Sequence, residues 1–200
     1  MHTDADSASR LTAAAQAEFL RCGYQKASLR AIAEQAGLTT GAVYFLFGSK
    51  AGLFHAVVDE AADALRSILI RGAEDEFTGT ASGEDTDRAF IRCLHLHREA
   101  AVILLEKADG SPLAGFRDEL AELLTDGFMR FFLRAGGDRA DEQLVRLLVE
   151  QRVHVMLRLV ALRLPLDTTM DYAVLLGAYG DAGFAGMMEQ YHRMERGSAQ

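Results

Sequence analysis

Hydroxyl and basic side chains gather in one short stretch of the sequence, between Ser28 and Lys50. Two of them, Thr39 and Thr40, stand where a helix is expected to begin. The free N–H groups and the positive dipole end of a helix start attract phosphate. Such a set of residues suits contact with the backbone of a DNA duplex, where phosphate contacts set the register of the protein.

The net charge of −8 is unevenly distributed along the chain. Residues 10–50 carry five basic side chains against Glu18 and Glu34, an excess of three positive charges, and the acidic excess lies elsewhere. Salt screens charges that are separated by more than about 8 Å at physiological ionic strength, so a distant acidic region repels DNA only weakly. A DNA-facing segment is therefore compatible with an acidic protein, and its small basic excess predicts weak binding by a single copy.

Other residues that could do chemistry lack the necessary spacing. Cys22 and Cys93 form no CxxC or Cys/His pattern and are expected to be buried thiols in a reducing cytoplasm. His95 and His97 are about 200° apart on a helix, so they cannot hold one metal ion from the same face. The sequence also lacks the GxSxG, P-loop, HExxH and GxGxxG motifs. We expect no catalytic site, no metal and no cofactor.

The elements that carry these residues are predicted to be helices, because apolar residues recur with a period of 3.6 and no alternating strand segment is found. A first stripe of Leu11, Ala15 and Phe19 ends near Gly23. The next helices are expected to begin at capping hydroxyl side chains, namely Ser28, Thr39 or Thr40, and Ser49.

The remainder of the chain is divided by turn residues rather than by a change of period. Residues 1–9 are expected to form a disordered tail, and the Gly, Glu, Asp, Thr and Ser of residues 71–87 predict a loop. Four later helical segments are expected at 85–108, 112–135, 140–164 and 168–195.

Two short helices joined through Gly37, the second opening with hydroxyl side chains, indicate a helix-turn-helix. Gly37 supplies a turn with positive φ, and Gly41 removes a side chain where a helix must approach a duplex closely. Residues 29–53 carry the string LRxIAxxAGLTxGxVYxxFxSKxxL, which resembles the N-terminal DNA-binding domain of the TetR family of transcriptional regulators. The resemblance covers roughly residues 10–69. Beyond them it extends only to length, helical content and the order of elements.

The resemblance implies DNA contacts at the starts of three helices and on the third one. The implied positions are Ser28, Arg30, Thr39, Thr40, Gly41, Tyr44 and Lys50, joined by Phe45. Alternative interpretations stay open, because Ser28 and Ser49 would be N-caps in any protein and Tyr44 could be a core aromatic residue.

This sequence departs from the family pattern at four positions. Family members commonly carry Lys at Thr40, a hydroxyl residue at Ala42, and polar or ring-nitrogen residues at Phe45 and Leu46, so hydrogen-bonding capacity is lost. Phe45 can contact a sugar or a thymine methyl group, or it can pack inward. We expect a shallow base readout, with specificity left to DNA shape and to a doubled site.

The last two helical segments are candidates for pairing two copies. Residues 144–164 are apolar on more than one face, which predicts burial on all sides, and the last segment interleaves small with large residues. The family pairs through a four-helix bundle of its last two long helices, although one large monomeric core is the alternative. The expected interface consists of Val153, Leu157, Val160, Leu176, Gly180, Gly183, Phe184 and Met187.

By the same resemblance, the middle helices would hold an effector pocket. Aromatic residues at helical spacing and His154 can also be plain core residues, which is the alternative interpretation. The expected lining residues are His95, Phe116, Phe128, His154 and Arg158, with Glu106, Met129, Phe131 and Phe132 as further candidates.

The composition, 50% apolar and 25% charged, is typical of a globular protein with a core. No stretch of eighteen apolar residues and no signal-like N-terminus is found, which predicts a cytoplasmic protein without membrane contact. We expect an all-α chain in which residues 10–69 form the DNA-binding domain and residues 70–200 a ligand-binding and dimerisation domain.

The expected function is that of a homodimeric transcriptional regulator and not an enzyme. It would be a repressor that a small, largely apolar effector releases from a palindromic operator in double-stranded DNA. One alternative is a helical ligand-binding or interaction protein without operator binding, and another is a helical enzyme acting on a small apolar substrate.

Overall fold

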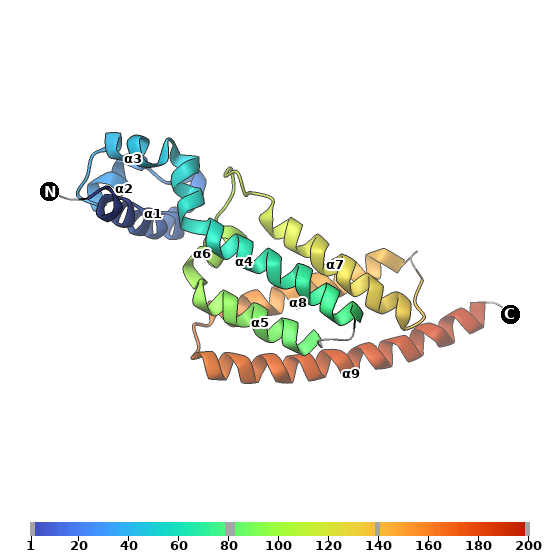
Figure 1. The fold of residues 1–200 in the computed structure, drawn as a ribbon. Coiled ribbons are helices and arrows are strands. Elements are labelled where there is room, and N and C mark those ends of the chain that lie inside the picture. Colours follow the sequence, from blue (N-terminus) through green and yellow to red (C-terminus); the bar gives the residue numbers. More distant parts are fainter. Residues whose placement is uncertain (1–2, 79–82, 139–140, 199–200) are drawn as a thin grey trace. The chain divides into compact units, whose positions relative to one another are not determined.

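The computed structural model describes residues 3–78, 83–138 and 141–198, and these residues contain helices and no strand (Figure 1). The prediction of an all-α protein is therefore confirmed. In chain order the described helices are α1 (Asp4–Lys26), α2 (Leu29–Gln35), α3 (Thr40–Phe47), α4 (Lys50–Thr78), α5 (Gly83–Leu96), α6 (Arg98–Glu106), α7 (Phe116–Arg134), α8 (Glu142–Ala161) and α9 (Leu166–Ser198).

The chain forms two compact units. The first unit combines the residues up to Arg66 with Leu96–Asp118, and the second combines Ser67–His95 with the residues from Glu119 onwards. Helices α4 and α7 contribute residues to both units.

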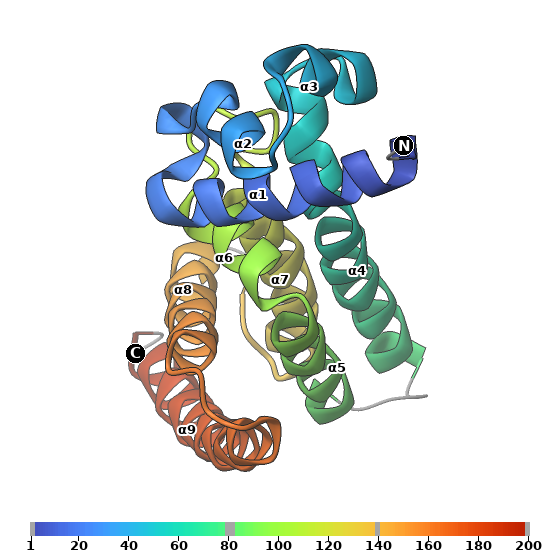
Figure 2. The same cartoon turned by 90° about the vertical axis from the view of Figure 1, so that its left-hand side faces the viewer.

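The core of the first unit lies between α1, α4 and α6. Figure 2 shows α2 and α3 on one side of α1 and α6 on the other. Phe19 and Phe54 are fully buried and meet edge to face, with ring centroids 5.3 Å apart. The Tyr24 ring packs on Phe54 at 4.9 Å, and the Tyr24 N–H donates to the Lys107 carbonyl at 2.9 Å. These contacts fix the end of α1 against α6.

Helix α1 begins earlier than expected. The predicted disordered tail at residues 1–9 is wrong for residues 4–9, because α1 starts at Asp4. The Thr3 hydroxyl caps the helix by accepting from the Asp6 N–H, and acidic side chains stand in the first turn, where the helix dipole favours them. The expected break at Gly23 is confirmed by its non-helical backbone, with φ 77°.

The loop expected at residues 71–87 is mostly helical. Helix α4 continues to Thr78 and α5 begins at Gly83, while residues 79–82 lie outside the described residues. Gly72 is buried, and a Cβ atom placed on it would lie 2.4 Å from the Thr86 Cγ2 atom. Gly72 thus permits close contact between two helices, whereas sequence reasoning interpreted it as a helix breaker.

Two further expectations about helices are corrected. The single helix expected at 85–108 is divided at His97, which has non-helical φ and ψ of −105° and 32°. Helix α8 is not buried on all sides in one chain, because Leu147, His154 and Arg158 are exposed.

The core of the second unit is built from α7, α8 and α9. Phe132, Val145 and Met188 are buried together there with Met129 and Val149. On the surface, Arg146 of α8 joins Glu122 of α7 at 2.7 Å and Glu142 of its own helix at 2.8 Å. Figure 1 shows α5, α7, α8 and α9 running lengthwise together within this unit.

The turn between α2 and α3 generates a stability prediction. Gly37 has φ 64°, and a Cβ atom on it would lie 2.7 Å from an Arg10 guanidinium nitrogen, whereas Gly48 has φ 74° and open space. Positive φ costs an L-residue about 1–2 kcal/mol at either position, and displacing Arg10 adds about 1 kcal/mol through a lost hydrogen bond. We expect Gly37→Ala to lower the free energy of unfolding more than Gly48→Ala, as measured by urea denaturation.

The control for this prediction is a double-mutant cycle with Arg10→Ala. Once Gly37→Ala has displaced the guanidinium, removing the Arg10 side chain should cost little more. Equal losses of stability for Gly37→Ala and Gly48→Ala, or full additivity with Arg10→Ala, would contradict the prediction.

Candidate nucleic-acid interface

Hydroxyl side chains begin both helices of the helix-turn-helix. The Ser28 hydroxyl accepts from the Ala31 N–H at 3.4 Å and caps α2, and the Thr39 hydroxyl accepts from the Ala42 N–H at 3.3 Å and caps α3. The open choice between Thr39 and Thr40 is thereby decided for Thr39. Both capping residues are exposed, so the starts of α2 and α3 lie at the protein surface.

A side chain from α1 holds the turn between these helices. The Arg10 guanidinium donates to the carbonyl of Ala36, the last residue before Gly37. That carbonyl belongs to the C-terminus of α2, where the helix dipole is negative and a cation is favourable. Arg10 therefore makes an intramolecular contact, although its charge was counted in the basic excess expected to face DNA.

Glu18 ties α1 to the start of α2. Its carboxylate accepts from the Arg21 guanidinium at 2.8 and 2.9 Å and from the Ser28 N–H at 3.4 Å. Burial by itself raises the pKa of Glu18, but these hydrogen bonds outweigh it, and the pKa lies below its ordinary value. Glu18 is thus held ionised and orients the residue that caps α2.

The outer face of α3 consists of Gly41, Tyr44 and Phe45. The Tyr44 side chain is 55% exposed and Phe45 is 77% exposed, whereas Val43 on the opposite face is fully buried. The inward-packing alternative for Phe45 and the core alternative for Tyr44 are therefore wrong. Val43 anchors the helix to the first unit while two aromatic rings point into solvent.

Gly41 has no role in the interior of the protein. Its backbone is not in the positive-φ region, and a Cβ atom placed on it would meet only the Thr39 hydroxyl at an ordinary 3.6 Å. Glycine lowers helix stability relative to alanine. A residue that is unfavourable for its own helix and is not required by packing points to close approach by something outside the chain.

The two basic residues expected to contact DNA, Arg30 and Lys50, make different contacts within the protein. The Arg30 side chain is 83% exposed, but its charge is offset by an ion pair with Glu34 at 2.8 Å. The Lys50 ammonium donates to the Gln25 carbonyl at 3.2 Å and lies 4.6 Å from the centre of the Tyr24 ring. Burial lowers the pKa of Lys50. A DNA contact by Lys50 stays a prediction, because its ammonium is bound to the end of α1.

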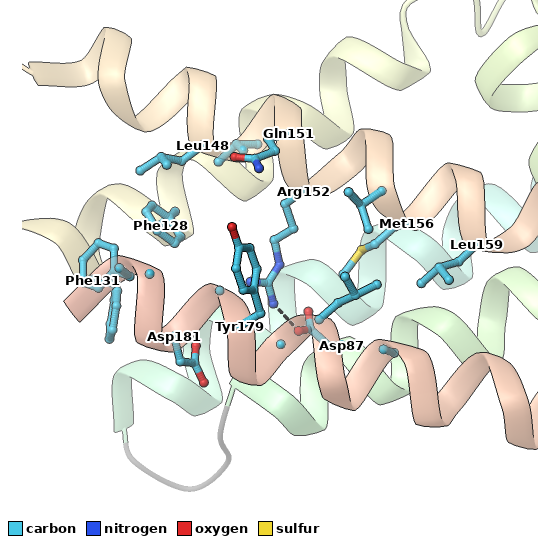
Figure 3. A pocket seen from close by; sticks show the side chains of 18 of the residues that line it. Asp87, Phe128, Phe131, Leu148, Gln151, Arg152, Met156, Leu159, Tyr179 and Asp181 are labelled. Carbon is cyan, nitrogen blue, oxygen red and sulfur yellow. Dashed lines mark hydrogen bonds and ion pairs between the residues drawn. The ribbon is translucent and has the colours of Figure 1, made fainter. Parts of the chain in front are cut away.

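A cavity of about 370 Å³ lies within the second unit, between α5, α7, α8 and α9. Phe131 and Phe184 pack at 4.9 Å between ring centroids in its wall, and Phe128 lies 5.5 Å from Phe184. An ion pair between Asp87 of α5 and Arg152 of α8 also lines the cavity. Figure 3 shows this pair away from the end where Phe128 and Phe131 gather. The cavity thus offers an aromatic end and an internally neutralised polar group.

Of the residues expected to line an effector pocket, Phe128 does so, as does Phe131. Phe116 is instead buried in the first unit, where the Arg66 guanidinium lies 4.9 Å from its ring. Met129 and Phe132 are core residues and do not line the cavity. The polar candidates His95, Glu106, His154 and Arg158 are also absent from its wall. Glu106 belongs to the first unit, and His154 and Arg158 are exposed.

The residues expected at the dimer interface lie in different parts of the second unit. Leu176, Gly180 and Gly183 line the cavity together with Phe184 and Met187, and Val153 packs against the core of the second unit. Leu157 is half-buried, and the side chain of Val160 lies outside the described residues. Their role in pairing stays a prediction.

Within the described ranges, no group of three or more His, Cys, Asp or Glu residues could hold a metal ion. No single described helix is long and apolar enough to cross a membrane. Helix α3 and the first part of α4 reach that threshold only when taken together, across a bend of 61°.

Residues 11–57 match the family model described as bacterial regulatory proteins, tetR family. Among solved structures, a TetR-like transcriptional regulator from a Rhodococcus species has a TM-score of 0.60 at 23% identity, covering 88% of this chain and 96% of that one. A transcriptional regulator from Aquifex aeolicus has a TM-score of 0.60 at 17% identity, covering 84% and 95%. Residues 11–57 thus carry a domain of the tetR family, and the solved structures share the fold of the chain.

A further structure similar to this chain is NalD of Pseudomonas aeruginosa, the secondary repressor of the MexAB-OprM multidrug efflux pump. It has a TM-score of 0.56 at 19% identity, and the match covers 87% of this chain and 94% of that one. Identities this low support the fold alone. The geometry of α2 and α3 shows a helix-turn-helix within the residues that match the family model.

Sequence reasoning missed most of the polar groups in the cavity. Asp87 lay in the expected loop, and Arg152, Gln151 and Tyr179 were not singled out. Arg152 interrupts an apolar run, which was an available signal. Its partner was hidden because the pair is sixty-five positions apart in the sequence.

Gly41 generates a prediction that separates folding from DNA binding. We expect Gly41→Ala to raise the free energy of unfolding by up to about 1 kcal/mol, because alanine favours a helix. The same change should lower DNA affinity roughly tenfold, the equivalent of one lost contact, because a methyl group would stand where the duplex approaches. Thermal unfolding and fluorescence anisotropy with labelled duplex measure the two effects.

The matched control is Gly127→Ala, a second helical glycine outside the cavity wall, where an added Cβ atom would make an ordinary contact at 3.8 Å from the Ala73 Cβ atom. It should also stabilise the protein and leave DNA affinity unchanged. Unchanged DNA affinity in Gly41→Ala would remove Gly41 from the interface.

Proposed function

We propose that this protein is a homodimeric repressor that binds a palindromic operator through α3 and leaves it when a small, largely apolar effector occupies the cavity of the second unit. The observation that carries the proposal is the solvent-exposed outer face of α3. Its glycine at position 41 is not required by any contact among the described residues. The role of NalD as a repressor supports the negative sign of regulation.

A dimer is proposed because the DNA-binding domain of a single copy should bind DNA weakly. The segment from residue 10 to residue 50 has a small basic excess, and Arg10, Arg30 and Lys50 are all engaged within the protein. Few free cations remain to displace counterions from phosphates, so one copy should bind weakly. A twofold dimer places two recognition helices on half-sites about one helical turn apart and multiplies the contacts.

The pairing surface that we propose is the side of α9 that faces away from the cavity. Leu175 is 68% exposed there, and Ala178 and Ala182 follow it at helical spacing and are also exposed. Small side chains at this spacing let two helices approach closely. An exposed Leu147 on α8 would add apolar area to the same bundle.

The effector is proposed to bind between α8 and α9. A volume of about 370 Å³ lies within the usual range of small-molecule pockets, and such pockets are mostly apolar with a few polar groups that orient the ligand. The aromatic cluster of Phe128, Phe131 and Phe184 would hold an apolar body. The Asp87–Arg152 pair would meet its polar end.

Helix α4 is the proposed connection between effector and operator. It begins next to α3 and continues into the second unit, so one helix contributes residues to both units. Release from DNA requires that the effector bind the operator-competent conformation and the released one with different affinities. The protein would act in the cytoplasm, where operators are found, and without enzymatic activity.

The dimer proposal is tested by Leu175→Glu. In a twofold interface the new carboxylate faces its own copy, so pairing should weaken, and operator affinity should fall roughly tenfold or more. Light scattering measures the mass against the chain mass of 21.8 kDa, and anisotropy measures the affinity on a duplex selected from a random pool, at two salt concentrations.

Leu96→Glu is the matched control, since Leu96 is 77% exposed and lies on another helix. It should keep both mass and affinity. A Leu175→Glu protein that remains dimeric would move the interface elsewhere. A wild-type protein that selects no duplex would leave the alternative of a ligand-binding protein without an operator.

The effector proposal is tested by filling the cavity. Gly180 lines it and has open space around a Cβ atom, so Gly180→Leu should insert a side chain without a clash. We expect the affinity for an uncharged apolar dye such as N-phenyl-naphthylamine to fall roughly tenfold, because the new leucine side chain would occupy the part of the cavity that the dye fills. Dye fluorescence measures binding, and loss of anisotropy of the bound duplex measures release.

The control Gly115→Leu also introduces leucine into open space, outside the cavity wall. It should bind the dye as the wild type does. Equal dye binding by the Gly180→Leu protein would place the effector site outside this cavity.

A further inference from the structure

The recognition helix has an unusual set of side chains. From Thr39 to Phe47 the sequence reads TTGAVYFLF and contains no charged residue, no amide and no imidazole. The side-chain hydrogen-bonding groups on this stretch are the hydroxyls of Thr39, Thr40 and Tyr44, and the Thr39 hydroxyl already caps α3. Direct base readout by this helix therefore rests on two hydroxyl groups and on apolar contact.

Bidentate hydrogen bonding to bases is unavailable to α3. Guanine is commonly read by Arg or Lys and adenine by Asn or Gln, each through two hydrogen bonds in the major groove. None of these residue types occurs between Thr39 and Phe47. What remains in the groove for an apolar side chain is the C5-methyl group of thymine, the one apolar substituent that the four bases present there.

Phe45 is the side chain placed to make that contact. It is 77% exposed, lies one helical turn after Gly41, and shares the outer face with Tyr44. Side chains on a helix tilt toward its N-terminus, which directs Phe45 toward the turn where Gly41 has no side chain. The absent side chain leaves room for the edge of a base beside the ring.

Exposure of a large aromatic ring is unfavourable in water, and no contact within the described residues compensates it at Phe45. We propose, on the basis of the operator-binding function above, that Phe45 selects thymine by packing on its C5-methyl group, so that each operator half-site holds a thymine at the position this ring reaches. A second protein copy seated on Phe45 is the competing occupant, and the test below distinguishes it.

The experiment removes one methyl group at a time from the DNA. The full-length protein selects duplexes from a random pool, and each thymine of the selected duplex is then replaced by deoxyuridine, symmetrically in both half-sites. Burial of one methyl-sized group corresponds to roughly a fourfold change in affinity. We expect one thymine position per half-site at which the double replacement weakens binding roughly tenfold, and little effect at the others.

The protein variants assign that methyl group to Phe45. Phe45→Ala should bind the thymine and deoxyuridine duplexes with equal affinity. The neighbouring variant Tyr44→Phe should keep the wild-type ratio between its affinities for the thymine and the deoxyuridine duplex. Because both side chains are exposed, circular dichroism should show unchanged helix content. A selection repeated with Phe45→Gln should replace thymine by adenine at the same position, since glutamine pairs with adenine.

The outcomes separate this inference from the function on which it rests. A selected duplex that tolerates deoxyuridine at every position, or a Phe45→Ala protein that keeps the methyl preference, would overturn the thymine contact and leave operator binding intact. Loss of self-association in Phe45→Ala, with DNA affinity unchanged, would assign the ring to a protein contact and also overturn it. Failure to select any duplex would overturn both proposals.

Discussion

The position of the recognition helix α3 depends on a turn that strongly favours glycine. Gly37 adopts positive φ between α2 and α3, and Arg10 closes over it by donating to the Ala36 carbonyl. A cation at the C-terminus of α2 is favourable by itself, and a side chain at Gly37 would have to displace it. A residue from the beginning of α1 thus stabilises the turn that precedes α3.

The two faces of α3 then have opposite requirements. Val43 is fully buried and connects the helix to the core, while Tyr44 and Phe45 beside it are exposed. Arg10, Arg30 and Lys50 are engaged in intramolecular contacts, so their attraction to phosphate is weak. In the proposed dimer, apolar contact together with the pairing of two copies would supply the affinity. A regulator of this design would discriminate operators by methyl groups and DNA shape more than by hydrogen bonds.

The second unit combines a well-packed core with a loosely filled interior between α8 and α9. Phe132, Val145 and Met188 are buried at one place, while the cavity next to them is closed by glycines of α9 around which a Cβ atom would have open space. In the proposed regulator, small residues on α9 would have two consequences, room for an effector on one side of the helix and close approach of a second copy on the other. Both consequences are compatible with a helix that responds to an effector.

The sequence by itself determined those features that depend only on residues close together along the chain. The helical period, the caps at Ser28 and Thr39, the turn at Gly37 and the family string are local, and the structure confirms the helices, caps and turn. The outward direction of Phe45, the inward attachment of Lys50 and the Asp87–Arg152 pair were decided by tertiary structure. Each of these depends on residues that folding brings together from distant positions, and no local pattern records such contacts.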